Sequence, residues 1–179
     1  MNIIKVITDE DFGLKSKKMK NPRLRIGARG IIFNKSNKIA ILFKEKKKEY
    51  KLMGGGVEIN EKPDFAFLRE SQEETGCSVK IIKNLGTIIE EKSRDNFKQI
   101  SYVYIAKVVE ENNIFNYTDK EIGEGSKLLW LDIDDAIKII NESENKLLPS
   151  IYDEKMSVYH TKFIVRRDYE ILKYFVNNS

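Results

Sequence analysis

The stretch GGGVEINEKPDFAFLRESQEETG, residues 54–76, joins three consecutive glycines to a segment rich in glutamate. Proline suits the first position of a helix, aspartate suits its first turn, and glycine suits the position just after its last turn. The segment contains these three signals in that order. The sequence therefore predicts a helix over 63–75 that ends at Gly76 and is entered from a tightly turning glycine segment.

Three glutamates of this helix fall on one face. Glu70, Glu73 and Glu74 are spaced i, i+3 and i+4, which brings their side chains together on a helix surface. Crowded carboxylates repel one another unless cations bind between them, and carboxylate oxygens are ligands that Mg²⁺ and Mn²⁺ prefer. The glycines allow the backbone to come close and to direct a carbonyl or amide at a metal ion or a phosphate. The pattern predicts a divalent-cation site.

Two further charged residues lie at the two sides of the helix entrance. Glu61 and Arg69 can form a bidentate ion pair, which would hold the glycine segment against the helix. We interpret this pair as structural support for the site rather than as part of the chemistry.

The spacing of these residues resembles the Nudix box, G-x5-E-x7-R-E-U-x-E-E-x-G-U, in which U is aliphatic. All seven fixed letters are present. The matching residues are Gly55, Glu61, Arg69, Glu70, Glu73, Glu74 and Gly76. Ser71 and Cys77 stand at the two aliphatic positions, Met53 replaces a common proline, and Asn60 replaces a common glycine. None of these departures removes a carboxylate.

This resemblance implies both a fold and an activity. The fold would be α+β, an α/β/α sandwich in which a mixed central sheet carries the box helix and C-terminal helices on its faces. The activity would be metal-dependent hydrolysis of the pyrophosphate bond of a nucleoside diphosphate derivative, by attack of water at phosphorus. The implied metal is Mg²⁺, with Mn²⁺ as an alternative. The implied metal ligands are Glu70, Glu73, Glu74 and the carbonyl of Gly54, supported by Gly55, Glu61, Arg69 and Gly76.

A carboxylate must also orient or deprotonate the attacking water. In this family it is a box glutamate, here Glu70 or Glu73, or a glutamate from a later loop. The segment 119–130 offers Glu121 and Glu124. We prefer Glu124, because the glycines on either side of it give the backbone freedom to turn its carboxylate inward.

Three arginines alternate along an expected strand that borders the substrate in this fold. Arg23, Arg25 and Arg29 are separated by even numbers of residues and therefore point to a common side. We weigh two roles for them, binding of substrate phosphates and salt bridges at the rim of the site.

The rest of the chain reads as one domain over 1–179, with a core of about 22–142 and a helical C-terminal extension over 143–179. Apolar and β-branched runs predict a hairpin over 24–45 and later strands, and 3.6-residue periodicity predicts two further helices. The later strands are expected at 79–92, 98–109 and 127–131, and the helices at 132–143 and 161–175.

Composition narrows the function classes. Of the 179 residues, 41% are apolar and 34% are charged, which is typical of a soluble globular protein. No apolar run approaches the about 20 residues that span a bilayer, and the N-terminus does not read as a secretory signal. The single cysteine, Cys77, favours a reducing cytoplasm. The single histidine, His160, excludes a His-rich metal site.

The expected partner is a small nucleotide substrate. The net charge is only +4, and no basic–aromatic pattern of an RNA-binding sheet is present, so nucleic acid is expected only as a 5′ end acted on as substrate. A homodimer is a further expectation from the family. Two alternatives to the hydrolase remain: a ligand-binding module without catalysis, which the intact glutamates argue against, and a diphosphate isomerase on the same scaffold, for which Cys77 is poorly placed.

Overall fold

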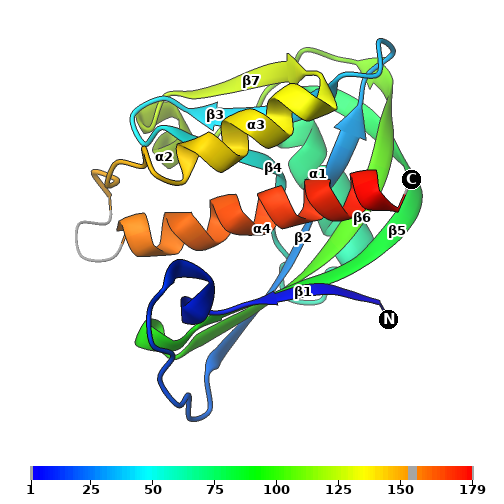
Figure 1. Cartoon of the computed structure of the whole chain (residues 1–179). Helices are drawn as coiled ribbons and strands as arrows, with labels where there is room; N and C mark the ends of the chain where they lie inside the picture. Colours follow the sequence, from blue (N-terminus) through cyan, green and yellow to red (C-terminus); the bar gives the residue numbers. More distant parts are fainter. Residues whose placement is uncertain (1, 153–156, 179) are drawn as a thin grey trace.

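A computed structural model of the chain describes residues 2–152 and 157–178. It contains a seven-stranded mixed sheet with the strand order β1-β5-β6-β2-β4-β3-β7 (Figure 1). β2 runs parallel to β6 and β1 parallel to β5, and the remaining neighbours are antiparallel. The strands are β1 (Ile3–Ile7), β2 (Arg23–Phe33), β3 (Ile39–Lys44), β4 (Glu49–Gly56), β5 (Cys77–Lys92), β6 (Phe97–Glu111) and β7 (Ser126–Leu131).

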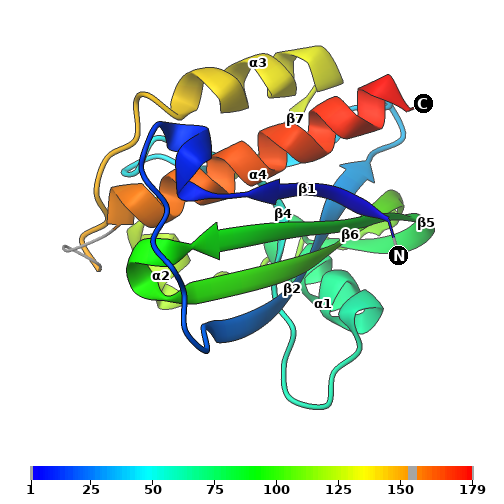
Figure 2. The same ribbon diagram turned by 60° about the horizontal axis from the view of Figure 1, so that its bottom comes forward.

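Helices cover both faces of this sheet (Figures 1 and 2). α3 and α4 pack on one face, where Ile140 and Phe163 join a fully buried apolar cluster with residues of β2, β3 and β5. α1 packs on the other face through Ala66 and Phe67. The α/β/α sandwich expected from the sequence is therefore confirmed. The helices are α1 (Pro63–Thr75), α2 (Asp119–Gly123), α3 (Ile133–Ser143) and α4 (Ser157–Asn177), with 3₁₀ turns at Asp9–Phe12 and Ser93–Asp95.

The expected hairpin over 24–45 is wrong in its pairing. Both of its strands form, but β2 and β3 pair only at Phe33 and Ile39, because β4 lies between them. β4 was not predicted, since its lysines and its three glycines hide the alternation of a strand. It pairs with β3 as far as Leu52 and with β2 from Met53 onward. The glycine end of β4 thus leaves β3 and lies along β2.

The other expected elements are confirmed with shifted ends. β5 and β6 form a long antiparallel pair, and α4 begins four residues before the expected 161. β1 and the one-turn helix α2 were not predicted. α2 is stabilised by a capping box between Thr118 and Glu121. None of the described helices is both long enough and apolar enough to cross a membrane.

Candidate active site

A cavity of about 440 Å³ lies where the glycine end of β4 meets α1, β2 and α4. Its lining includes eight lysine or arginine side chains and four carboxylates. The cations are Arg23, Arg25, Arg29, Lys47, Lys51, Lys92, Lys120 and Arg167, and the acids are Glu70, Glu74, Asp95 and Glu121. This excess of positive charge at the end of the predicted metal face makes the cavity the candidate site.

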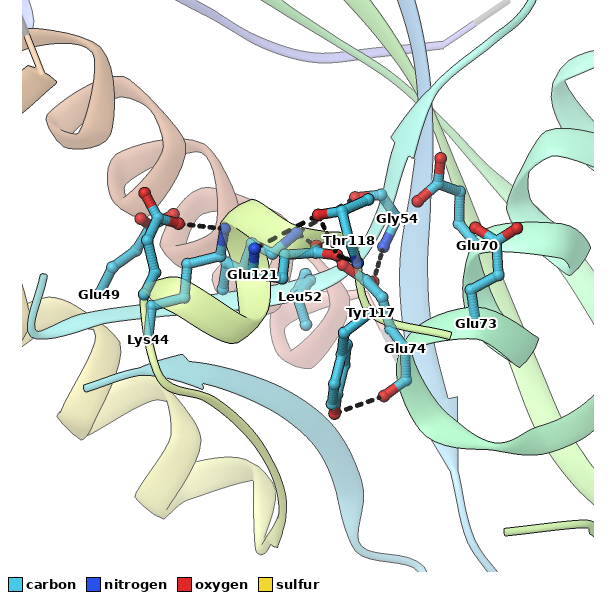
Figure 3. A network of polar contacts seen from close by, with 12 residues as sticks. Lys44, Glu49, Leu52, Gly54, Glu70, Glu73, Glu74, Tyr117, Thr118 and Glu121 are labelled. Atoms are coloured by element: carbon cyan, nitrogen blue, oxygen red, sulfur yellow. Dashed lines mark hydrogen bonds and ion pairs between the residues drawn. The ribbon is translucent and has the colours of Figure 1, made fainter. Parts of the chain in front are cut away.

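Glu74 is the buried member of the glutamate face, with 2% of its surface exposed. One carboxylate oxygen accepts the Gly54 N–H at 2.8 Å, and the other lies 2.7 Å from the Lys51 ammonium. Figure 3 shows the side chain turned toward Gly54 and away from Glu70 and Glu73. Burial raises the pKa of the Glu74 carboxyl, and the Lys51 charge opposes that change. Glu74 therefore joins α1 to β4.

Glu70 and Glu73 are only partly buried, and both contact Arg69. The Arg69 Nη1 lies 2.9 Å from Glu70 Oε1 and 3.3 Å from Glu73 Oε2. A Cβ atom at Gly55 would lie 2.3 Å from Glu70 Oε1, so any side chain there would displace this carboxylate. Gly55 is thus required by the close approach of α1 to β4.

The expected pair at the helix entrance is present. Arg69 donates to both oxygens of Glu61, at 3.0 and 3.1 Å. The same guanidinium donates to the Gly56 carbonyl at 3.2 Å, and the Glu58 N–H donates to Glu61 at 2.9 Å. The Arg69 hydrogen bonds hold the pKa of the Glu61 carboxyl below its usual value. One guanidinium therefore fixes the loop, the end of β4 and the glutamate face relative to one another.

The oxygen atoms of Glu70, Glu73, Glu74 and Gly54 are suitable ligands for a divalent cation, but the structure does not group them around a single ion position. Within residues 2–152 and 157–178, no three histidine, cysteine or acidic side chains are grouped so that they could hold a metal ion. Arg69 and Lys51 instead neutralise the glutamates. The Lys51 ammonium lies 2.7 Å from Glu74 and 3.5 Å from the Gly54 carbonyl, so two of the expected ligands already converge on a positive charge.

The two later glutamates occupy different environments. Glu124 is 1% exposed, and its carboxylate accepts from the Lys44 ammonium at 2.8 Å and from the Ser150 hydroxyl at 2.7 Å. Glu124 is not among the residues that line the cavity, whereas Glu121 is. Glu121 accepts the Thr118 N–H at 3.0 Å, and its charge contributes to the raised pKa of Glu74. Glu121 thus lies at the cavity, whereas the carboxylate of Glu124, which we preferred from the sequence, is engaged by Lys44 and Ser150.

The three arginines of β2 all line the cavity. Arg23 lies over the ring of Phe97, with its guanidinium carbon 4.8 Å from the ring centre. Arg25 lies against Gly56, where a Cβ atom would be 2.9 Å from its Nη2. Arg29 is 4% exposed, and burial, followed by the charge of Arg167, lowers its pKa to about 10.

Charged residues of β5 and α4 complete the cavity wall, and the sequence reading missed their role. Arg167 donates to Glu90 at 3.0 Å and to Asp168 at 2.8 Å, and Lys92 lies 3.1 Å from the other oxygen of Glu90. Burial alone would raise the pKa of Glu90, but the charges of Lys92 and Arg167 lower it to about 2. A signal existed, because Arg167 and Asp168 interrupt the apolar face of the last helix between Phe163 and Ile171.

A comparison of the sequence with known protein families shows which family the chain belongs to. The family model described as NUDIX domain matches residues 23–151, which is most of the chain. The chain belongs to the Nudix family. Its box residues are therefore those on α1 and the adjoining loop, and α4, which supplies Arg167, lies beyond the matched segment.

Individual relatives and structures agree with this assignment. The chain is 38% identical over 87 residues to diphosphoinositol polyphosphate phosphohydrolase 2 of Rattus norvegicus, covering 49% of this chain and 45% of that protein. It is 34% identical over 87 residues to the 3-alpha enzyme of Mus musculus, covering 49% of each. The chain thus spans about half the length of these curated relatives. A solved UDP-X diphosphatase is similar in fold, with a TM-score of 0.55 at 16% identity over 91% of this chain and 67% of that one.

Proposed function

We propose that this Nudix protein is a hydrolase that cleaves the pyrophosphate bond of a nucleoside diphosphate derivative by attack of water at phosphorus. The observation that carries the proposal is the shared cavity, in which glutamates of the box face a wall of lysine and arginine. Carboxylates suit a divalent cation, and the cations suit the phosphate oxygens of a diphosphate.

Mg²⁺, or Mn²⁺ in its place, would be held by Glu70, Glu73, Glu74 and the Gly54 carbonyl. When bound, the ion supplies neutralisation of phosphate charge and a lower pKa for coordinated water. Lys51 lies between two of these ligands, so its ammonium has to move toward the cavity, where it can contact a phosphate oxygen. Gly55 and Gly76 support this arrangement, the latter by ending α1 in a left-handed conformation, φ 64°.

The proton of the attacking water needs an acceptor at the cavity. Glu70 lines the cavity, and Glu73, one turn further along α1, lies outside the lining. Their side chains are 19% and 33% accessible, and each can take the proton once Arg69 is drawn to Glu61 alone. Glu121 is the candidate from the later loop, because it lines the cavity while Glu124 is held by Lys44 and Ser150. The role of Arg23, Arg25 and Arg29 is to bind substrate phosphates.

A second substrate class is favoured by the strength of the positive charge. The lining contains eight lysine or arginine side chains against four carboxylates, and this surplus of positive charge suits a molecule with more phosphate groups than a single diphosphate. The curated relatives are named as phosphohydrolases of diphosphoinositol polyphosphates, which are small, densely phosphorylated molecules. A diphosphate carried on such a polyphosphorylated molecule is therefore the alternative to a nucleotide. A cytoplasmic location and a homodimer remain predictions from the sequence.

A substrate panel tests the proposal. Sugar nucleotides, nucleoside triphosphates, dinucleoside polyphosphates, capped RNA and diphosphoinositol polyphosphates are incubated with the protein and Mg²⁺ or Mn²⁺. Release of phosphate, pyrophosphate and nucleoside monophosphate is measured, with Glu73→Gln as the inactive control. We expect turnover of at least one diphosphate by the native protein alone. Equal product formation by Glu73→Gln would show that this glutamate of the box does not take part in the reaction.

A further inference from the structure

The end of α1 needs hydrogen-bond donors from outside the helix. The last carbonyl groups of a helix have no N–H of the same helix to accept from, and the last turn of α1 contains no basic side chain. The Gly76 N–H satisfies the carbonyl of Gln72, at 2.9 Å. The carbonyls of Glu73 and Glu74, which belong to the box, therefore need donors from another part of the chain.

The segment 112–117, which follows β6, supplies these donors. Its first two N–H groups donate to the carbonyl of the glycine that ends α1, both at 2.9 Å. The Asn116 N–H donates to the Glu73 carbonyl at 2.9 Å. The Tyr117 hydroxyl donates to the Glu74 carbonyl at 3.1 Å, across 43 residues of sequence (Figure 3). This segment therefore caps the helix that carries the box.

Tyr117 is the half-buried point of an exposed stretch. Between 113 and 120, every other residue is exposed, whereas the Tyr117 ring packs against the apolar cluster beneath α1, which includes Phe67 and Cys77. The ring also lies beside that of Phe115, with 5.6 Å between the ring centres. The ring and the hydroxyl of one side chain thus hold this stretch against the box helix.

α2 begins directly after this anchor. Thr118 is its N-cap, and both the N–H and the hydroxyl of Thr118 donate to the Glu121 carboxylate, each at 3.0 Å. The position of the Glu121 carboxylate is therefore set by the residue that follows Tyr117. Since Glu121 and Glu74 line the same cavity, the hydrogen bond from Tyr117 to Glu74 fixes the later glutamate relative to the box.

The other parts of this connection are fixed independently. The Gly54 N–H and the Lys51 ammonium hold the Glu74 carboxylate, at 2.8 and 2.7 Å respectively, so the end of α1 is a firm support. Beyond α2, the Glu124 carboxylate is buried against β3. α2 is thus held between two anchors, and the first of them, Tyr117, is the one that contacts the box helix.

We propose that Tyr117 is a positioning residue, which ties the segment before α2 to the box helix and thereby places the Glu121 carboxylate at the cavity. Its hydroxyl is engaged by the Glu74 carbonyl, and Tyr117 is not among the residues that line the active-site cavity. It therefore acts through Glu121 and does not contact substrate. The inference rests on the proposed function, in which Glu121 is the proton acceptor from the later loop.

Removal of one hydroxyl tests this role. Tyr117→Phe keeps the ring in the apolar cluster and deletes the hydrogen bond to Glu74, so the variant should melt close to the native temperature. Displacement of a reacting group by about 1 Å can cost about 10²-fold in rate. We expect kcat on the best substrate of the panel to fall on the order of tenfold. KM should stay within about a factor of two, because the cationic wall is intact.

The matched control is Tyr169→Phe. It removes the same atom from a partly buried ring that packs in the apolar cluster on the opposite face of the sheet. This variant should keep the native kcat. A native kcat in Tyr117→Phe, or an equal loss in Tyr169→Phe, would overturn the inference.

A double variant separates positioning from a general structural effect. If Tyr117 acts through Glu121, then Tyr117→Phe combined with Glu121→Gln should lose no more kcat than Glu121→Gln alone. Losses that multiply, or a loss in Tyr117→Phe when Glu121→Gln is fully active, would contradict the proposal. If Tyr117→Phe fails to fold, Thr118→Val repeats the comparison, because it removes the hydroxyl that binds Glu121 at the other end of the connection.

Hydrogen exchange follows the same connection without substrate. The N–H groups of Ile122 and Glu124 each donate to a carbonyl one turn earlier, at 2.9 Å. Their exchange should be about fivefold faster in Tyr117→Phe, the factor for one ordinary hydrogen bond, and native in Tyr169→Phe.

The outcomes distinguish this inference from the proposed function. Faster exchange in Tyr117→Phe, with no turnover of any diphosphate by the native protein, would leave the connection standing and remove the hydrolase. Turnover of a diphosphate with a native kcat in Tyr117→Phe would remove the positioning role and leave the hydrolase. Native exchange in Tyr117→Phe would overturn the inference in either case.

Discussion

The acidic face of α1 and the basic wall of β2 meet at one cavity but are neutralised differently. Each box glutamate of α1 has a cation of the chain beside it: Arg69 contacts Glu70 and Glu73, and Lys51 contacts Glu74. On β2, by contrast, Arg25 and Arg29 form no ion pair with an acid of the described residues. The carboxylates are balanced from within the protein, and the arginines are not.

This difference suggests how each region meets its ligand. A cation that binds the glutamates has to displace Lys51 and Arg69, so its binding is an exchange of one positive charge for another. An anion that binds at β2 displaces nothing and relieves buried positive charge. We therefore expect metal affinity to be set by competition with the chain's own cations, and anion affinity to be set by the fixed arginines.

The largest expected effect concerns the acidic face. Glu73→Gln should leave the fold intact and lower turnover by roughly 10²–10⁴, because an amide gives less charge to a hard cation and cannot take a proton. The measurement is kcat at limiting Mg²⁺, with circular dichroism to confirm folding. Glu142→Gln is the matched control, because its side chain is 48% exposed and pairs, among the described residues, only with Lys146. Native turnover in Glu73→Gln would show that the face is not catalytic.

Substitutions of the two later glutamates should have different effects, one mainly on turnover and the other mainly on stability. Glu121→Gln is expected to lower turnover roughly tenfold or more with little change in melting temperature, since its carboxylate lines the cavity. Glu124→Gln should mainly destabilise the protein, by about 2 kcal/mol, because it leaves the Lys44 ammonium buried without its acid. Turnover and urea unfolding are measured on both variants. A large loss of turnover confined to Glu124→Gln, at unchanged stability, would restore the preference from the sequence.

The smallest effect concerns acid stability of the basic wall. Glu90 has a pKa lowered to about 2 from 4.5, so its ionisation stabilises the fold above pH 4.5 and that stabilisation is lost as the pH falls toward 2. By linkage, the stability of the native protein therefore falls in this pH range as Glu90 takes up a proton. Urea unfolding at several pH values should show a weaker dependence in Glu90→Gln than in the native protein. Parallel curves for the two proteins would contradict the role given to Glu90.

The sequence predicted those parts of the site that are formed by residues close together in the chain. The helix over 63–75 and the Glu61–Arg69 pair depend on spacing within one short segment, and the structure contains both. Of the three glutamates expected on one face, Glu74 instead turns toward Gly54 and Lys51. The layered fold followed from the same segment, through the family that it resembles. Local patterns of charge and periodicity were sufficient because these contacts form between residues close in the chain.

What the sequence could not give depends on residues far apart in the chain. β4 was hidden by its lysines and glycines, and its place between β2 and β3 follows only from tertiary pairing. Lys51 meets Glu74, and Arg167 meets Glu90, over separations of 23 and 77 residues. Glu124 looked free to turn inward because glycines flank it, but burial beside Lys44 engages its carboxylate.

Hydrolysis in ¹⁸O-labelled water tests the central claim most directly. The best diphosphate from the substrate panel is incubated with the native protein in EDTA and again after addition of excess Mg²⁺, and the products are analysed by mass spectrometry. The account predicts no turnover in EDTA, recovery with Mg²⁺, and one ¹⁸O atom in a single phosphorylated product, as water attack at one phosphorus requires. Turnover that persists in EDTA, or products that carry no ¹⁸O, would contradict it.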